Sequence, residues 1–98
     1  MPKGYWIANL DVQDAQTYEK YRSAIAKPLA DYGARFVVRG GTQQVREGNM
    51  RSRTVVIEFP SYAEAVACYE SAAYQSAKDI RLSAAVANLI IIEGYDQG

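Results

Sequence analysis

The chain has 98 residues, the size of one domain, so residues 1–98 are expected to form a single folding unit. Eleven basic side chains balance eleven acidic ones, so the formal net charge is zero and no overall field attracts nucleic acid or an anionic membrane. Histidine is absent, which excludes histidine-based triads, histidine-held haem and most zinc sites.

The first expected elements are a strand and a long helix. Apolar and polar side chains alternate through "GYWIANLDV" (4–12), as they do in a strand. Asp14 is placed to cap the helix that follows. Pro28 predicts a kink or a restart of this helix because it lacks a backbone donor, and Gly33 predicts the helix end. One stripe at helical spacing is expected to be buried: Tyr18, Tyr21, Ile25, Leu29 and Tyr32.

Two strand-like segments then flank a pair of glycines. "ARFVVR" (34–39) and "TQQVRE" (42–47) lie on either side of Gly40-Gly41. Paired glycines at such a place supply the positive φ angles of a tight turn, so the sequence predicts a hairpin there. After a further turn around "GNMRS", the segment "RTVVIEF" (53–59) is the most strand-like of the chain.

The last third of the chain reads as two helical pieces and a strand. Pro60 ends the preceding strand, and Ser61 and Glu64 have the spacing of a capping box. A second helical piece is expected from about Tyr74, and "NLIIIEGY" (88–95) is a final strand. The order β-α-β-β-β-α-α-β predicts an α+β fold, a decorated ferredoxin-like βαββαβ with an antiparallel sheet. The buried face of the first of these helices is expected to hold Tyr62, Ala65, Val66 and Tyr69.

The strands carry apolar side chains on both faces. In 53–59 and 88–95 both alternating sets are mainly apolar. Helices cover one face of an α+β sheet, so an apolar second face needs another layer. The chain has no spare element for that layer, and we predict a symmetric homodimer that packs sheet against sheet. The alternative is that an edge strand or the C-terminal tail covers this face.

The chain also contains five distinctive segments: "KGYWIANLDVQD", "YEKY", "GARFVVRGG", "RTVVIEFPSYAEA" and "YQSAK". Together they resemble the bacterial domain-of-unknown-function family 1330 (DUF1330), over nearly the whole chain from about Lys3 to Gly94. That family belongs to the dimeric α+β barrel superfamily, so the resemblance implies a ferredoxin-like subunit and a homodimer. Members often carry Pro-Glu where this chain has Ala72-Ala73, which predicts an altered helix start near Tyr74. The resemblance transfers no biochemical activity.

Arg39-Gly40-Gly41 is a candidate anion site, in which backbone amides and a guanidinium converge on a carboxylate or phosphate. The alternative is a plain hairpin with a solvated or ion-paired arginine. The glycines have a structural reason to be there, whereas the turn does not need Arg39. RNA binding is disfavoured by the zero net charge and because "TVVIEF" lacks the aromatic pair that stacks on bases.

Eight tyrosines in 98 residues suggest an aromatic pocket between the helices and the sheet. A buried tyrosine needs a partner for its hydroxyl, so it suits a site that combines apolar walls with a few polar groups. The alternative is an ordinary core packed with aromatic rings. The candidate wall residues are Tyr18, Tyr21, Tyr62, Tyr69 and Tyr74, together with Trp6.

Charged residues also occur within the strands. Arg35, Arg39 and Arg53 alternate with apolar residues. An inward pair with Glu58 would be a buried ion pair and would indicate a site, whereas outward charges would protect the sheet edge or pair across a dimer. The pattern does not tell which face points inward. Cys68, beside the apolar stripe of its helix, is expected to be a buried small hydrophobe.

Three functions fit these observations. The first is a homodimer that binds a small anionic or aromatic metabolite between sheet and helices. The second is an enzyme similar to the cofactor-independent monooxygenases and isomerases of the superfamily. The third is a structural interaction module without a ligand. The candidate ligand-binding residues are Arg39, Tyr18, Asn9, Trp6, Tyr69 and Glu58, and no catalytic residue is assigned.

Several classes of partner are not expected. We predict no metal, no cofactor, no nucleic acid and no membrane partner, and expect the protein itself and a small molecule as the partners. The N-terminal "MPKGYWIANL" does not read as a signal peptide, and a single cysteine fits a reducing compartment, so a cytoplasmic location is expected.

Overall fold

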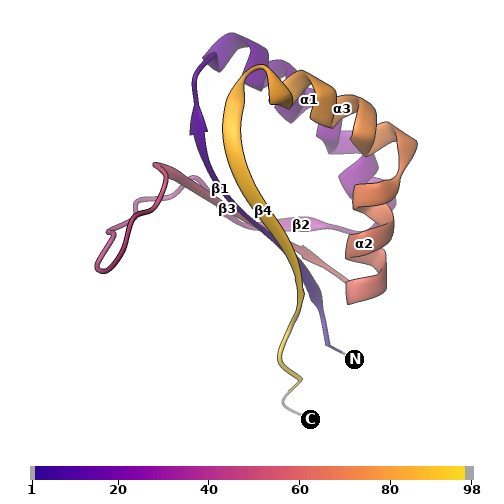
Figure 1. Ribbon diagram of the computed structural model, residues 1–98. Helices are drawn as coiled ribbons and strands as arrows, with labels where there is room; N and C mark the ends of the chain where they lie inside the picture. Colours follow the sequence, from indigo (N-terminus) through magenta and orange to yellow (C-terminus); the bar gives the residue numbers. More distant parts are fainter. Residues whose placement is uncertain (1, 97–98) are drawn as a thin grey trace.

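Residues 2–96, which the computed structural model describes, fold into four strands and three helices (Figure 1). The strands stand in the order β2-β3-β1-β4, all antiparallel, and the helices lie on one face of the sheet. This confirms the predicted ferredoxin-like βαββαβ fold, with its second helix divided in two. The elements are β1 (Gly4–Val12), α1 (Ala15–Asp31), β2 (Arg35–Arg39), β3 (Arg53–Phe59), α2 (Tyr62–Glu70), α3 (Ala72–Leu82) and β4 (Ala85–Glu93).

The strand register divides the side chains of the sheet between two faces. Trp6 of β1 pairs with Ile57 of β3 and Ile91 of β4, and these three side chains point toward the helices. We call this the inner face. The residues one position along the strands point the opposite way, to the outer face. Among residues 2–96 no helix is long and apolar enough to cross a membrane.

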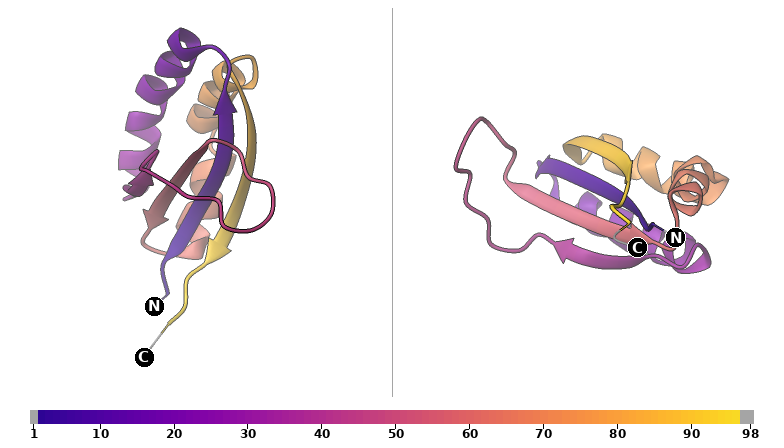
Figure 2. Two further views of the ribbon diagram at one scale, coloured as in Figure 1. Left: turned by 90° about the vertical axis from the view of Figure 1, so that its left-hand side faces the viewer. Right: turned by 90° about the horizontal axis from the view of Figure 1, so that it is seen from below.

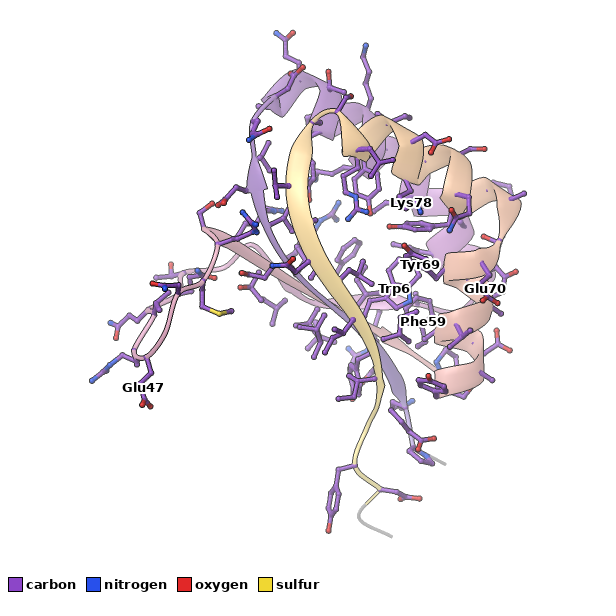
Figure 3. The ribbon with its side chains drawn as sticks, in the orientation of Figure 1. Trp6, Glu47, Phe59, Tyr69, Glu70 and Lys78 are labelled. Carbon is purple, nitrogen blue, oxygen red and sulfur yellow. The ribbon has the colours of Figure 1, made fainter. Side chains whose placement is uncertain are left out.

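The core is centred on Trp6, which is 1% exposed (Figure 3). The centroid of its ring lies 5.0 Å from that of Phe59, 5.8 Å from Tyr69 and 4.7 Å from Tyr74. Its Nε1 donates a hydrogen bond of 2.8 Å to the backbone oxygen of Ala65. Aromatic pairs of this kind add roughly 0.5–1.5 kcal/mol each beyond their burial. This one side chain therefore joins β1 to β3, α2 and α3.

The predicted helix termini are confirmed by capping contacts. Asp14 accepts a hydrogen bond of 3.2 Å from the backbone nitrogen of Thr17, and Gly33 has a φ of 70° just after α1. The hydroxyl of Ser61 accepts a hydrogen bond of 3.1 Å from the backbone nitrogen of Glu64 at the start of α2. These contacts satisfy backbone groups that a helix end leaves without partners.

Two expectations about the helices need correction. α1 continues through Pro28 to Asp31 without restarting, and the proline removes only the single helical hydrogen bond that its own nitrogen would have donated. α3 begins at Ala72, two residues before the expected start. The hydroxyl of Ser71 accepts a hydrogen bond of 3.2 Å from the Tyr74 nitrogen and donates one of 2.7 Å to the Cys68 oxygen, so it ends α2 and caps α3.

The prediction of a tight hairpin at Gly40-Gly41 is wrong. β2 ends at Arg39, and residues 40–52 form an irregular loop that extends away from the helices (Figure 2). Gly40 does turn the chain with a φ of 70°, but the segment 42–47, expected to be a strand, pairs with no strand of the described chain.

Side chains of β1 hold the end of this loop in place of a paired strand. Asn9 accepts a hydrogen bond of 2.7 Å from the backbone nitrogen of Arg51 and donates one of 3.2 Å to the backbone oxygen of the same residue. Asp11 accepts hydrogen bonds from the backbone nitrogen of Ser52 at 2.9 Å and from Arg51 at 3.0 Å. These hydrogen bonds satisfy backbone groups that strand pairing would otherwise have satisfied. The periodicity of 42–47 could not reveal such side-chain bonds from β1.

The outer face of the sheet carries a row of branched apolar side chains across all four strands. Val38, Val56, Ile7 and Ile90 lie side by side in the register of β2, β3, β1 and β4. Val38 is 38% exposed and Ile90 is 53% exposed. No element in residues 2–96 covers this row, so neither alternative cover, by an edge strand or by the tail, is seen in the described part of the chain.

Gly4 marks a close approach of β1 to the start of α2. A Cβ atom at this position would lie 2.7 Å from the Cα of Tyr62, closer than packed atoms allow. We expect Gly4→Ala to lower the free energy of unfolding by roughly 1–3 kcal/mol, because the two backbones must separate. Gly41→Ala is the matched control, since a Cβ there meets nothing within 4 Å. Denaturant titration compares the two variants, and equal stabilities would contradict this packing.

Candidate functional site

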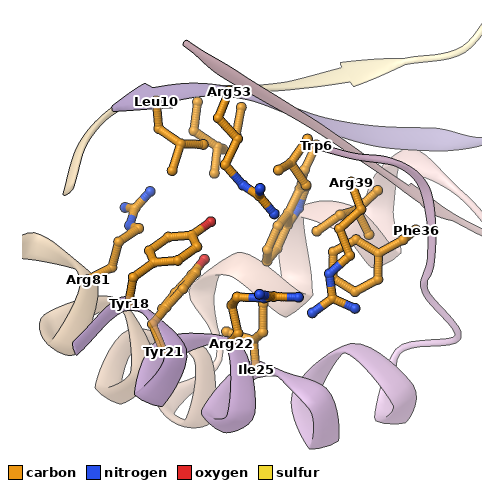
Figure 4. Close-up of a pocket in the computed structure, with 14 residues that line it drawn as sticks. Trp6, Leu10, Tyr18, Tyr21, Arg22, Ile25, Phe36, Arg39, Arg53 and Arg81 are labelled. Atoms are coloured by element: carbon orange, nitrogen blue, oxygen red, sulfur yellow. The ribbon is translucent and has the colours of Figure 1, made fainter. Parts of the chain in front are cut away.

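A cavity lies between the inner face of the sheet and helices α1 and α3 (Figure 4). Its volume is about 30 Å³. A single water needs about 10–15 Å³, so the enclosed part has room for roughly two water-sized groups. Most of the wall is aromatic or aliphatic, and includes Trp6, Leu10, Tyr18, Tyr21, Ile25 and Phe36.

Four arginines from four different elements also line this cavity: Arg22 of α1, Arg39 of β2, Arg53 of β3 and Arg81 of α3. Figure 4 shows their side chains around the same space, with Arg39 and Arg81 on opposite sides of it. The lining, which belongs entirely to the described chain, contains no aspartate or glutamate. The cavity is therefore a strongly positive site in a chain of zero net charge.

An irregularity in β2 turns Arg39 into the cavity. Phe36 pairs with Ile57 and Arg39 pairs with Val55, both on the inner face, although strict alternation would place residues three apart on opposite faces. The register shifts between Phe36 and Val38, so one additional residue is accommodated and the alternation is inverted beyond it. As a result the guanidinium of Arg39 lies over the ring of Phe36, 4.0 Å from its centroid.

Gly40 makes room for the second strand arginine. A Cβ atom at Gly40 would lie 2.6 Å from Cζ of Arg53, so any larger residue would displace that guanidinium. The Gly40 nitrogen also donates a hydrogen bond of 2.9 Å to the Thr54 oxygen, which fixes the end of β2 against β3. Arg39 thus lines the cavity itself, and Gly40 leaves the space that the Arg53 guanidinium occupies.

The two helix arginines complete the ring of charge. Arg22 forms a short ion pair with Glu19, outside the lining, at 2.5 Å. Arg81 is 8% exposed, and its guanidinium lies 5.6 Å from the centroid of the Tyr21 ring. A charged side chain buried to this degree normally has an anionic partner. Within residues 2–96 no carboxylate pairs with Arg39, Arg53 or Arg81.

Several hydrogen-bond donors at the cavity have no acceptor in the described chain. Nε of Arg22 and Nε of Arg53 are both inaccessible and without a partner. The hydroxyl of Tyr18 also makes no hydrogen bond to residues 2–96, although that oxygen is not one of the inaccessible atoms. Buried polar groups are nearly always hydrogen-bonded, so a cluster of unpaired donors indicates a place for an acceptor.

Tyr21 presents a neutral hydroxyl beside this cluster. Its oxygen lies 3.0 Å from that of Tyr74, and burial is the main cause that raises the pKa of both tyrosines. An ordinary tyrosine, with a pKa of about 10, is already neutral at pH 7, and the raised pKa keeps both hydroxyls protonated to higher pH. The pair therefore acts as a source of hydrogen bonds and not as a base.

Half of the six predicted ligand-binding residues line the cavity. These are Arg39, Tyr18 and Trp6. Tyr69 belongs to the core beside the cavity, where its ring lies 5.2 Å from that of Tyr74 and 5.4 Å from Nζ of Lys78.

The other two, Asn9 and Glu58, lie on the outer face. Asn9 anchors the loop 40–52, as described above. Glu58 accepts hydrogen bonds from Arg35 at 2.6 Å and from Tyr5 at 3.2 Å, and its pKa is lowered mainly by the bond from Arg35. The structure does not bring these residues together with Arg39. The strand arginines therefore lie on both faces, with Arg39 and Arg53 on the inner face and Arg35 on the outer face.

The helix arginines were missed, although the sequence contains a signal for each. Arg22 follows Tyr18 by four positions and precedes Ile25 by three, which places it on the buried stripe of α1. Arg81 follows Ala77 by four positions on the buried stripe of α3. An arginine within an otherwise apolar helical stripe indicates a buried charge, and this signal is present in the sequence.

Cys68 contributes no reactive group. It is fully buried, as predicted, and burial is the first cause that raises its pKa to about 11. In residues 2–96 no group of three side chains of the metal-ligating types is gathered in one place.

Solved structures share the fold at low sequence identity. A protein of unknown function from Rhodopseudomonas palustris is 18% identical, with a TM-score of 0.76 over 97% of this chain and 84% of its own. SnoaB, a cofactor-independent oxygenase from Streptomyces nogalater, is 8% identical, with a TM-score of 0.64 over 99% and 97% of the two chains. A dimeric ferredoxin-like protein of unknown function from Thermobifida fusca is 15% identical, with a TM-score of 0.56 over 93% and 92%. At these identities the similarity shows the fold alone.

The comparison by sequence is more specific. No curated protein matches the chain significantly. The family model described as "Domain of unknown function (DUF1330)" matches residues 3–95. This range includes every element of the fold and all four arginines of the cavity, and it agrees with the resemblance seen in the sequence. The chain therefore belongs to the DUF1330 family.

Proposed function

We propose that this protein is a homodimer in which each subunit binds a small anionic ligand in the cavity between the sheet and the helices. The observation that carries the proposal is the convergence of four arginines on one partly open cavity whose lining has no carboxylate. Guanidinium groups so arranged repel one another and lose hydration, and an anion removes both penalties. An apolar part of such a ligand would lie outside the small cavity and contact the aromatic wall at its more exposed end, near Phe36.

Binding fits the lining better than proton-transfer chemistry does. The walls offer guanidinium and hydroxyl donors but no carboxylate, thiol or imidazole that could take up a proton. The fold of SnoaB supports the oxygenase alternative only at the level of architecture. A purely structural module gives no reason for four arginines to line one cavity.

The outer face supports the homodimer. The row Val38, Val56, Ile7 and Ile90 is apolar, and a second copy would present the same row to it under two-fold symmetry. Such a contact would bury side chains that otherwise face water on all four strands. The cavity lies on the opposite side of the sheet, so dimer formation would leave it accessible.

Replacement of Arg53 tests the anion site. We expect Arg53→Gln to weaken binding of benzoate or inorganic phosphate about tenfold or more, since a hydrogen bond to a charged group contributes roughly 1.5–3 kcal/mol. Without ligand the melting temperature should stay the same or rise, because one of four like charges is removed. Arg46→Gln, at an exposed loop residue with the same change of charge, is the control. Isothermal titration calorimetry at low ionic strength measures binding, and a large loss of stability would instead assign Arg53 a structural role.

Gly40→Ala should weaken the same anion without any change of charge. A Cβ at Gly40 displaces the Arg53 guanidinium, whereas Gly48, with a comparable φ of 77°, has nothing within 4 Å of its Cβ position. Both substitutions force alanine into a left-handed conformation at a cost of roughly 1 kcal/mol, so Gly48→Ala controls for backbone strain. We expect calorimetry to show reduced anion affinity only in Gly40→Ala, and equal affinities would argue against this role of Gly40.

Replacement of Ile90 tests the homodimer. Ile90→Glu places a charge at the β4 end of the apolar row, where the exposed isoleucine would otherwise be buried by the second copy, so we expect it to shift the protein from dimer to monomer in native mass spectrometry and sedimentation. Leu82→Glu is the matched control, because Leu82 is 63% exposed at the end of α3, away from the outer face. A wild-type protein that is monomeric at every concentration would overturn the sheet-to-sheet assembly.

A further inference from the structure

The charge of the cavity also indicates how many negative charges its ligand carries. This inference rests on the function proposed above. Arg39, Arg53 and Arg81 have no carboxylate partner in residues 2–96, and only Arg22 is paired, with Glu19. At least three positive charges therefore remain uncompensated around one space. Arg81 is buried and Arg53 is half-buried, whereas Arg39 is exposed to solvent, so a ligand with a single negative charge would leave one buried or half-buried charge unpaired, which is unfavourable. The cavity is matched to a ligand with two negative charges.

The size of the cavity restricts where those charges sit. Its volume of about 30 Å³, roughly that of two water-sized groups, is too small for two separated carboxylates with the carbon frame between them. The remainder of a ligand would lie toward the more exposed end, where Arg39 covers the ring of Phe36. Both charges should therefore belong to one headgroup.

The directions of the donors indicate the shape of that headgroup. In Figure 4, Arg53 approaches the centre from the sheet, Arg22 approaches from α1 on the opposite side, and the hydroxyls of Tyr18 and Tyr21 point in from a third direction. A planar carboxylate has two oxygens in one plane. A tetrahedral phosphate presents three terminal oxygens in different directions, and arginine pairs with such oxygens through its several fixed N–H groups.

We infer that the cavity binds the dianionic headgroup of a small phosphate monoester, with Arg22, Arg53 and Tyr18 donating to its oxygens and Arg39 and Phe36 facing the ester group. The shared chemistry is a divalent tetrahedral oxyanion, which inorganic phosphate also provides. A phosphate ester and free phosphate differ only in what occupies the end of the cavity near Phe36.

A series of matched probes tests the charge. Phenyl phosphate, phenyl sulfate and benzoate carry the same ring, but only the first is a dianion near neutral pH. We expect calorimetry at about pH 8 to show phenyl phosphate binding about tenfold or more tightly than the other two, since each added charge-assisted hydrogen bond has roughly that effect. Arg53→Gln should remove most of this preference, and Arg46→Gln should leave it unchanged.

The pH dependence gives an independent readout. The second pKa of a phosphate monoester is about 6, so lowering the pH from about 8 to about 5 makes phenyl phosphate a monoanion. Its affinity should then fall toward that of phenyl sulfate. The protein groups that face the cavity are Tyr18, Tyr21 and the four arginines, with Tyr74 behind Tyr21 and Glu19 outside Arg22. Arginine stays charged over this range, and phenyl sulfate, which does not titrate, reports any change in the protein itself.

Each other outcome overturns the inference in a distinguishable way. If benzoate and phenyl sulfate bind as tightly as phenyl phosphate, and all three depend on Arg53, the anion site stands and its preference for a dianion is wrong. If phthalate, with two separate carboxylates, binds more tightly than phenyl phosphate, the inference of a single headgroup is wrong.

If inorganic phosphate binds as tightly as phenyl phosphate, the ester is not required and free phosphate is the ligand. If no probe binds, or if Arg53→Gln has no effect, both the dianion and the proposed function fail.

Discussion

The helices of this subunit cover only one face of its sheet, and the rest of the structure depends on that asymmetry. Trp6 holds the covered face together, because its ring and its Nε1 contact β3, α2 and α3 at once. The same packing leaves a small space beside the indole, bounded by α1 and α3, and this space is the cavity. On the other face the row from Val38 to Ile90 has no cover in residues 2–96.

The cavity has charges that the fold itself does not need. Four arginines around one space lower the stability of the empty subunit, because like charges repel and two buried Nε donors lack acceptors. A protein selected for stability alone would have apolar residues there. The presence of four arginines, each on a different element, is the main support for the proposed anion site.

Some site residues could be predicted from the pattern of neighbouring residues in the sequence, and others could not. Tyr18 and Trp6 could be predicted because each belongs to a clear apolar pattern, which places it toward the core. Arg39 was assigned from its unusual Arg-Gly-Gly context, but its inward direction depends on the register shift before Val38, which no alternation reveals. Asn9 was a plausible polar strand residue, but alternation along 4–12 already placed it on the face opposite to Trp6. For Glu58, only the register showed that it lies on the outer face. Arg22 and Arg81 were not predicted, because a charged side chain on a helix is usually exposed to solvent.

The sequence by itself determined the order of the elements, their capped ends, the membership of the DUF1330 family and the apolar character of both sheet faces. These properties follow from local patterns, in which residues a few positions apart act together. It did not determine which face of the strand 53–59 is inner, because both of its alternating sets are apolar and alternation tells which residues share a face but not where that face points. Only the tertiary structure decided this, and with it the gathering of Arg22, Arg39, Arg53 and Arg81 at one cavity, because that gathering requires four elements distant in the chain to pack together.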